Sequence, residues 1–150
     1  MRRLLPLLAV LCLAAGCGGS RHSSGTTTAT TAGTAPAPRG NGCVAVPHSL
    51  LAKLESGLVL EGATLVHVRA YRSPDFPTYY FVSGRVPQLG GPKVNVVTFA
   101  VNGLQAPKEI AAVDTNARQI SQFGPGKRHD PALTLFTRGA KESRACVTGS

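Results

Sequence analysis

Three histidines follow residue 42, and they are the side chains best suited to general acid–base chemistry: His48, His67 and His129. Hydrolysis through a serine or cysteine needs a nucleophile held beside such a base. No serine lies in a G-x-S-x-G segment, the usual setting of a nucleophilic serine between a strand and a helix. An alternative function is that of a hydrolase whose site residues are far apart in sequence. In that case His67 or His129 would work with Asp75 or Asp114. Solvent-exposed histidines are the simpler interpretation.

The patterns that bind metal ions or phosphate are incomplete. The sequence has no C-x-x-C, no H-x-x-x-H and no carboxylate-rich loop of the calcium-binding kind. His129 and Asp130 have no companion ligands, and an aspartate before Pro131 is more typical of a turn or a helix cap. The segment Gly124-Pro125-Gly126-Lys127 lacks the earlier glycine and the later Ser or Thr of a P-loop. We therefore expect no metal site and no cofactor.

Positive charge is the clearest remaining signal. The chain has a formal net charge of +9, and residues 43–150 contain 12 basic and 7 acidic side chains. Lys127, Arg128 and His129 form a local basic loop, a candidate anion-binding site for lipid headgroups or phosphate-bearing wall polymer. Three more basic residues recur at a spacing that could share one helix face: Arg138, Lys141 and Arg144. A solvated basic surface is the alternative, and nucleic acid is not expected as a partner because no aromatic stacking platform is evident.

A short leader precedes a lone cysteine. Arg2 and Arg3 give the leader a positive start, and Leu4 to Ala15 is an apolar run of 12 residues. A bilayer-spanning helix needs roughly 20 residues, whereas a run of this length suits the apolar region of a secretory signal peptide. The leader therefore predicts export.

The end of the leader, Leu13-Ala14-Ala15-Gly16-Cys17, resembles the lipobox of bacterial lipoproteins, although the leucine stands one position further from the cysteine than usual. The resemblance implies removal of residues 1–16 and a diacylglycerol with palmitate-type chains on the Cys17 sulfur. Two buried acyl chains hold a protein durably at a membrane. We expect an extracytoplasmic lipoprotein of the cell membrane; an ordinary signal peptide, with Cys17 incidental, is the alternative.

Residues 17–42 have the composition of a tether. Between Gly18 and Gly42 there are nine Ser or Thr residues, two prolines, no acidic residue and no apolar side chain larger than alanine. Such a segment cannot bury enough apolar surface to offset the entropy of ordering its backbone. We predict a disordered spacer, with attachment of O-linked sugar as an alternative use of its threonines.

Residues 43–150 are long enough for one domain with its own core. Once Cys12 is removed with the leader and Cys17 is acylated, only Cys43 and Cys146 remain. Two remaining cysteines in an oxidising exterior most simply pair. We predict a disulfide that joins the two ends of the domain, the alternative being two buried free thiols.

The apolar periodicity of this domain predicts an α+β fold. A helix is expected after Pro47, ending at Gly57, with short helices after Asp114 and over 139–147. Four strands are expected, over residues 64–71, 79–86, 94–101 and 109–113. Short connections indicate an antiparallel sheet, with the helices on one of its faces. Residues 131–138 are ambiguous, because Leu133 to Phe136 suits either a strand or a first helical turn.

The order of several short segments resembles a group of small secreted proteins and lipoproteins of actinobacteria. These segments are Ser73-Pro74-Asp75-Phe76, Tyr80-Phe81-Val82-Ser83, Ala112-Val113-Asp114 and a late cysteine. The resemblance implies the location and the fold class, and it supplies no site residues. The function expected from the sequence is a non-enzymatic binding module of the envelope, which contacts another envelope protein or an anionic polymer.

Overall fold

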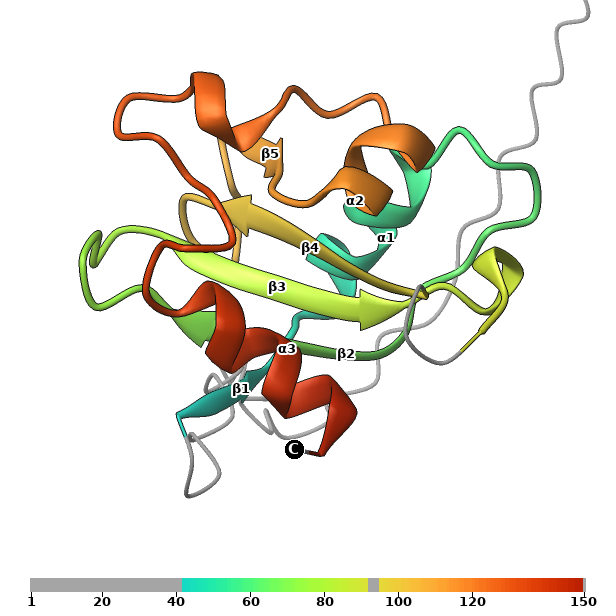
Figure 1. Cartoon of the computed structure of the whole chain (residues 1–150), viewed down its shortest axis with the longest axis horizontal. Coiled ribbons are helices and arrows are strands. Elements are labelled where there is room, and N and C mark those ends of the chain that lie inside the picture. The colour runs from blue at the N-terminus through green and yellow to red at the C-terminus, as the bar shows by residue number, and fades with distance from the viewer. Residues whose placement is uncertain (1–41, 92–94, 150) are drawn as a thin grey trace, which may run out of the picture. The chain divides into compact units, whose positions relative to one another are not determined.

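Residues 42–91 and 95–149 are described by the computed structural model, and they form an antiparallel sheet with helices on both faces (Figure 1). The sheet has five strands in the order β1-β2-β3-β4-β5, so each strand pairs with its neighbours in sequence. Their bounds are β1 Cys43–Ala45, β2 Val66–Arg72, β3 Tyr80–Arg85, β4 Val96–Val101 and β5 Ile110–Ala112. The α+β class and the antiparallel sheet are confirmed.

The helices are short and begin and end close to the expected residues. Their bounds are α1 His48–Ser56, α2 Thr115–Ile120 and α3 Ala140–Thr148, with single 3-10 turns η1 Pro87–Leu89 and η2 Gly126–Arg128. Asp114 caps α2, because its side chain accepts a hydrogen bond from the Ala117 N–H at 2.7 Å. Residues 131–138 contain neither a strand nor a helix, so both alternatives for this segment are wrong.

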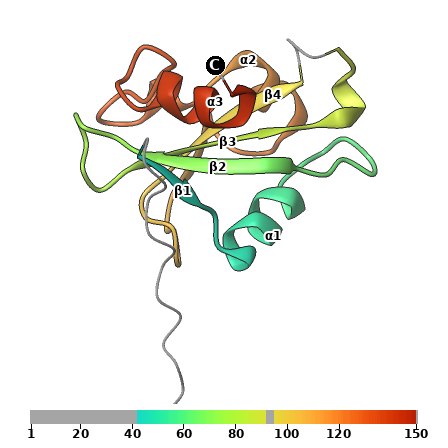
Figure 2. The ribbon, with the colours of Figure 1, turned by 90° about the horizontal axis from the view of Figure 1, so that it is seen from below.

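The placement of all helices on one face is also wrong. On one face, α1 and α2 cover the larger apolar cluster, to which they contribute Leu50, Leu54, Ala117 and Ile120. On the other face, α3 packs across the first four strands, and a smaller cluster forms around Phe81. Figure 2 shows α1 and α3 on opposite sides of the sheet. The central strands are therefore enclosed between helices.

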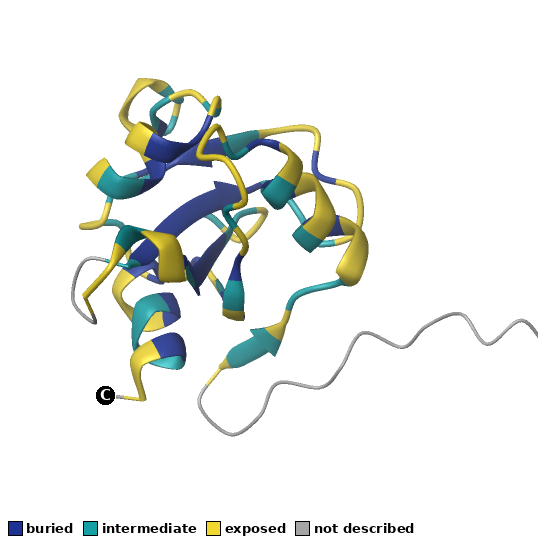
Figure 3. Ribbon diagram, turned by 90° about the vertical axis from the view of Figure 1, so that its right-hand side faces the viewer, coloured by how far each residue is buried: buried dark blue, intermediate teal, exposed yellow. Residues whose placement is uncertain are grey.

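The composition of the central strands explains this two-sided packing. All six residues of β4 are buried, as are the four inner residues of β3 (Figure 3). A strand with apolar or small residues on both faces needs cover on both. Polar–apolar alternation is strong only in β2, where Val68 and Ala70 are buried and Arg69 is exposed. The alternation in β2, which suggests a sheet with one solvent-exposed face, therefore does not hold for β3 and β4.

Candidate binding surface

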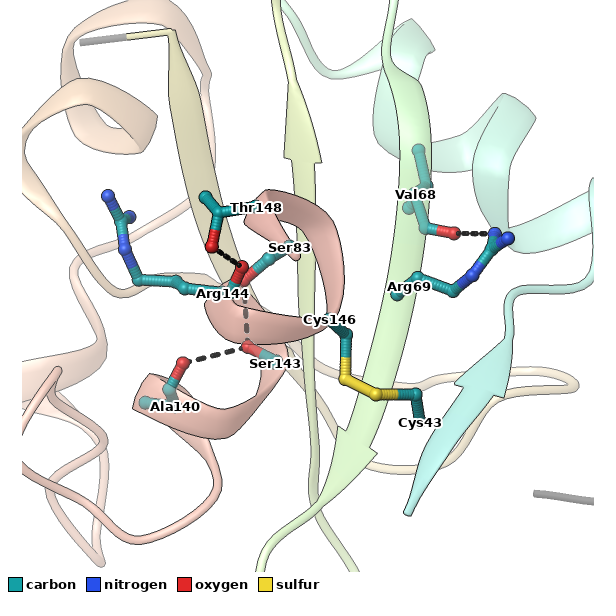
Figure 4. Close-up of a disulfide and its surroundings, with 9 residues drawn as sticks. All are labelled: Cys43, Val68, Arg69, Ser83, Ala140, Ser143, Arg144, Cys146 and Thr148. Carbon is teal, nitrogen blue, oxygen red and sulfur yellow. Dashed lines mark hydrogen bonds between the residues drawn. A yellow bond between two sulfur atoms is a disulfide. The ribbon is translucent and has the colours of Figure 1, made fainter. Parts of the chain in front are cut away.

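The predicted pairing of the two remaining cysteines is confirmed. Cys43 and Cys146 form a disulfide with their Cα atoms 5.9 Å apart, at a sequence separation of 103. Cys43 begins β1 and Cys146 lies in α3, so the bond joins the first described strand to the last helix (Figure 4). The bond fixes the start of the domain against the face of the sheet that α3 covers.

The leader, the lipidation residue Cys17 and the tether lie outside the described residues. The signal peptide, the lipidation of Cys17 and the tether therefore rest on the sequence. Within residues 42–91 and 95–149, no helix has the length and apolar character needed to cross a bilayer.

The residues of the alternative hydrolase site are not assembled. His67 is exposed on β2 at an irregularity of the pairing with β3, where its φ is 55°. His129 is half-buried after η2. Asp75 pairs with Arg138, and Asp114 pairs with Arg144. No hydrogen bond joins any histidine side chain to a carboxylate within the described part of the chain. That part also contains no group of His, Cys, Asp and Glu side chains that could hold a metal ion.

The basic residues divide into two groups instead of forming one helix face. Arg144 is partly buried, with Nη1 2.9 Å from the Asp114 carboxylate, whereas Arg138 lies on the surface 3.5 Å from Asp75. Lys127 and Arg128 are exposed, and neither takes part in the ion pairs of the described residues. The expected shared face is therefore wrong, and the basic loop around η2 remains a solvent-accessible group of cations.

Arg144 is the centre of a buried polar network beneath α3. Its Nη1 donates to the Thr98 hydroxyl at 3.1 Å, to the Val96 carbonyl at 3.3 Å and to Asp114. Burial raises the pKa of Asp114, because the loss of water outweighs the hydrogen bond from Ala117 and the attraction of Arg144, which lower it. The network attaches α3 to β4 and to the start of α2.

Hydroxyl groups extend this network without forming a catalytic arrangement. Ser83 lies 2.7 Å from Ser143 and 3.1 Å from Thr98, oxygen to oxygen, and all three side chains are fully buried. Ser143 also donates to the Ala140 carbonyl at 2.9 Å (Figure 4). None of these hydroxyls bonds to a histidine in the described residues, and α3 separates them from solvent. The group satisfies the polar atoms between the sheet and α3.

The described residues form a concave surface where β1 begins and the β2–β3 loop turns. A hollow of about 520 Å³ lies between the start of β1 and the β2–β3 loop. Eight residues line it: Gly42, Val44, Tyr71, Arg72, Ser73, Pro74, Pro77 and Tyr80. Two tyrosine rings and two prolines therefore supply most of its large side chains.

A second hollow of about 360 Å³ shares Val44 and Tyr80 with the first. It continues along Ala45 and Pro47 to the β4–β5 loop at Leu104. Val44, Tyr80 and Leu104 pack against the edge of the larger apolar cluster. We call the two hollows together the Tyr80 groove. It runs from the β2–β3 loop past the start of β1 to the β4–β5 loop.

The wall of the Tyr80 groove on the β2–β3 loop is held in place. The Ser73 hydroxyl accepts a hydrogen bond from the Phe76 N–H at 3.2 Å and donates to the Arg138 carbonyl at 3.0 Å. Arg72 Nε donates to the Pro77 carbonyl at 2.7 Å, which holds an exposed guanidinium beside the groove. The groove thus offers a preformed apolar surface with a cation at its rim, a combination typical of binding sites for small molecules and peptides.

Sequence reasoning did not identify the Tyr80 groove. Its residues come from β1, the end of β2, the start of β3 and the β4–β5 loop, so the sheet register decides which of them meet. The one local signal is the cluster of prolines and aromatic residues between Ser73 and Tyr80. Comparisons with protein-family models, with curated proteins and with solved structures found no match.

Proposed function

We propose that this protein is a lipid-anchored, extracytoplasmic binding module without catalytic activity, and that it contacts its partner through the Tyr80 groove. The observation that carries the proposal is the groove itself, where Tyr71, Tyr80, Pro74 and Pro77 line an open and preformed apolar surface. Aromatic and proline side chains supply contact area at low entropic cost, because few of their torsions must be fixed. Binding, not chemistry, is what this surface is suited to do.

The proposed location is the outer side of a bacterial membrane, with a diacylglycerol on Cys17. It is supported by the lipobox-like leader and by the Cys43–Cys146 disulfide, since disulfides persist in oxidising compartments. Mass spectrometry of the N-terminal peptide tests the anchor directly. We expect a peptide that begins at an acylated Cys17, and release of Cys17→Ala from the membrane; an unmodified N-terminus at Met1 would refute the anchor.

The proposed partner is another envelope protein that presents an extended segment with apolar or proline residues. Aromatic-lined grooves recognise such segments because their extended conformation is already low in entropy. The groove borders β1, the first strand in the order of the described sheet, so an extended segment bound there would lie beside a sheet edge, the setting in which peptides add a strand. The exposed Arg72 favours an acidic residue beside the bound segment.

Site-specific photo-crosslinking in intact cells tests this surface. A photoreactive residue replaces Pro77 in the groove in one variant, and Gln119, exposed on α2, in the control. We expect one dominant protein adduct from position 77 and none from position 119. Tyr71→Ala in the position-77 background should reduce the adduct. Equal adducts at both positions would contradict the proposal, as would turnover of wall glycans, esters or peptides that is lost in His67→Ala or His129→Ala.

A further inference from the structure

The segment that follows η2 contains a tight turn that presents two apolar side chains to solvent. Thr134 and Thr137 close this turn through three hydrogen bonds: Thr134 N to Thr137 Oγ1 at 3.0 Å, Phe136 N to Thr134 Oγ1 at 3.2 Å, and Thr137 N to the Thr134 carbonyl at 3.1 Å. Leu135 and Phe136 occupy its tip. Phe136 is 98% exposed and Leu135 is 38% exposed.

The base of this turn is attached to the body of the domain. The Arg138 N–H donates to Asp75 Oδ2 at 3.2 Å, and the Arg138 carbonyl accepts a hydrogen bond from the Ser73 hydroxyl. On the other side, the Leu133 N–H donates to the Gly126 carbonyl at 2.9 Å, and the Leu133 side chain is fully buried. These hydrogen bonds fix the backbone that presents Phe136 to solvent. The turn is therefore already ordered before any binding partner covers the Phe136 ring.

Basic residues flank the exposed pair along the chain. Residues 126–142 contain Lys127, Arg128, Arg138 and Lys141, against two acidic residues, Asp130 and Glu142. Lys127, Arg128 and Lys141 are exposed, and Glu142 is engaged at the start of α3, where Oε2 accepts a hydrogen bond from the Gly139 N–H at 2.7 Å. Basic residues therefore outnumber acidic ones along this stretch, while Asp75 pairs with Arg138 at the base of the turn.

We infer that this turn is a membrane-contact site, at which Phe136 and Leu135 enter the interface of a bilayer while Lys127 and Arg128 contact anionic lipid headgroups. Aromatic and leucine side chains insert into the interface of a bilayer, and nearby basic side chains are attracted to anionic lipid headgroups. A protein partner is the weaker assignment. Two protruding side chains offer far less than the ~800 Å² that each partner buries in a stable protein interface, whereas a fluid bilayer accepts a small convex tip.

This contact is separate from the Tyr80 groove and does not require the acyl chains. The experiment therefore uses the full chain with Cys17→Ser, which cannot be acylated. The chain contains no tryptophan, so Phe136→Trp introduces a single indole that reports on its own surroundings. The matched control is Val59→Trp, because Val59 is an apolar residue that is 63% exposed on the α1–β2 loop. Any vesicle binding through the leader is common to both variants.

Both variants are titrated with vesicles of phosphatidylcholine alone and of phosphatidylcholine mixed with phosphatidylglycerol. We expect the emission of Phe136→Trp to shift to shorter wavelength with the anionic vesicles, and brominated lipid in those vesicles to quench it. Val59→Trp should show neither effect. Equal responses of the two variants, or no shift for Phe136→Trp, would overturn the inference.

Charge removal and a soluble polyanion complete the test. Lys127→Gln with Arg128→Gln should weaken the response of Phe136→Trp to anionic vesicles about 30-fold, from the contribution of each basic residue near an anionic surface. Unchanged binding would refute the role of these cations. Polyglycerol phosphate in solution should leave the emission wavelength unchanged, since it provides no apolar phase. A shift with this polymer equal to that with vesicles would assign the site to a wall polymer and would contradict the bilayer.

Discussion

Arg144 Nη1 lies 2.9 Å from Asp114 Oδ2, so the last helix of the domain is bonded to the residue that caps α2. The side chains are 29% and 7% exposed, so a partly buried cation pairs with a buried carboxylate. The second pair of the described residues, Arg138 with Asp75, is open to solvent at 71% and 35%. A comparison of the two pairs therefore measures how much an ion pair contributes to stability when it is partly buried and when it is open to solvent.

Arg144→Met should destabilise the domain strongly. It retains much of the aliphatic packing but leaves the Asp114 carboxylate buried without its cation, and we expect the free energy of unfolding to fall by about 3 kcal/mol. Arg138→Met should lower it by less than about 1 kcal/mol, because water screens the surface pair. Urea unfolding of both variants with the disulfide intact measures the difference. Similar losses in the two variants would contradict the greater contribution expected of the pair that contains the buried Asp114 carboxylate.

The stability of the domain should depend on pH through Asp114. Burial raises the pKa of this carboxyl above its ordinary value of 3.8, so the folded state holds the proton more tightly than the unfolded state. The stability that the protonated form contributes is complete below the unfolded pKa of 3.8. It is lost as the pH rises through the higher folded pKa.

Asp114→Asn isolates this effect, because asparagine retains the capping oxygen but does not titrate. From pH 3.8 upward, the free energy of unfolding of the native protein should decrease relative to that of the variant, and then level off. Urea unfolding at a series of pH values measures the difference. A difference that increases with pH would show that the hydrogen bonds from Ala117 and Thr98 and the charge of Arg144 together lower the pKa of Asp114 by more than burial raises it.

Reduction of the Cys43–Cys146 disulfide should lower the free energy of unfolding by about 4–5 kcal/mol. The bond closes a loop over a sequence separation of 103 residues, and the chain-entropy model gives a loss of this size. Denaturation with and without reductant measures the effect, with thiol titration to establish complete reduction. The double variant Cys43→Ala, Cys146→Ala is the control: it should match the reduced protein and should not respond to reductant.

Gly126→Ala should disturb the base of the basic loop. A Cβ at this position would collide with the backbone carbonyl oxygen of Leu133, which cannot move aside as the end of a flexible side chain can. We expect a loss of about 1–3 kcal/mol in the free energy of unfolding, the usual cost of overpacking. Gly124→Ala is the control, since a Cβ there meets nothing within 4 Å. Thermal unfolding of the two variants side by side decides the matter: equal melting temperatures would refute the predicted collision.

The main elements of the fold could be predicted because their patterns are local. The four expected strands end within two residues of β2, β3, β4 and β5, and Asp114 and Gly57 were expected at the limits of their helices. β1 could not be found this way, since it has three residues and its partner is distant in sequence, with Cys43 opposite Tyr71. The continuous apolar run of β4 contained the signal for helices on both faces.

The sites were less predictable, because they depend on the tertiary arrangement. Counting cysteines was enough to identify the Cys43–Cys146 pair. Arg144 could not be distinguished from Arg138 by sequence, since only the packing of α3 leaves one side chain 29% exposed and the other 71% exposed. Phe136 belongs to an apolar run that suggested a strand or a helix, and the hydrogen bonds of Thr134 and Thr137 instead fold it into an exposed turn.

The position of Cys43 has a mechanical consequence. A pulling force applied to the chain before Gly42 reaches Cys43 first and the rest of β1 afterwards. β1 pairs only with β2, through three residue pairs. The covalent link carries that load directly into α3, which spans the neighbouring strands and is bonded to β4 through Arg144. Force is therefore spread across the sheet instead of peeling away its outermost strand, and the domain resists extension from this end for as long as the two sulfurs stay joined.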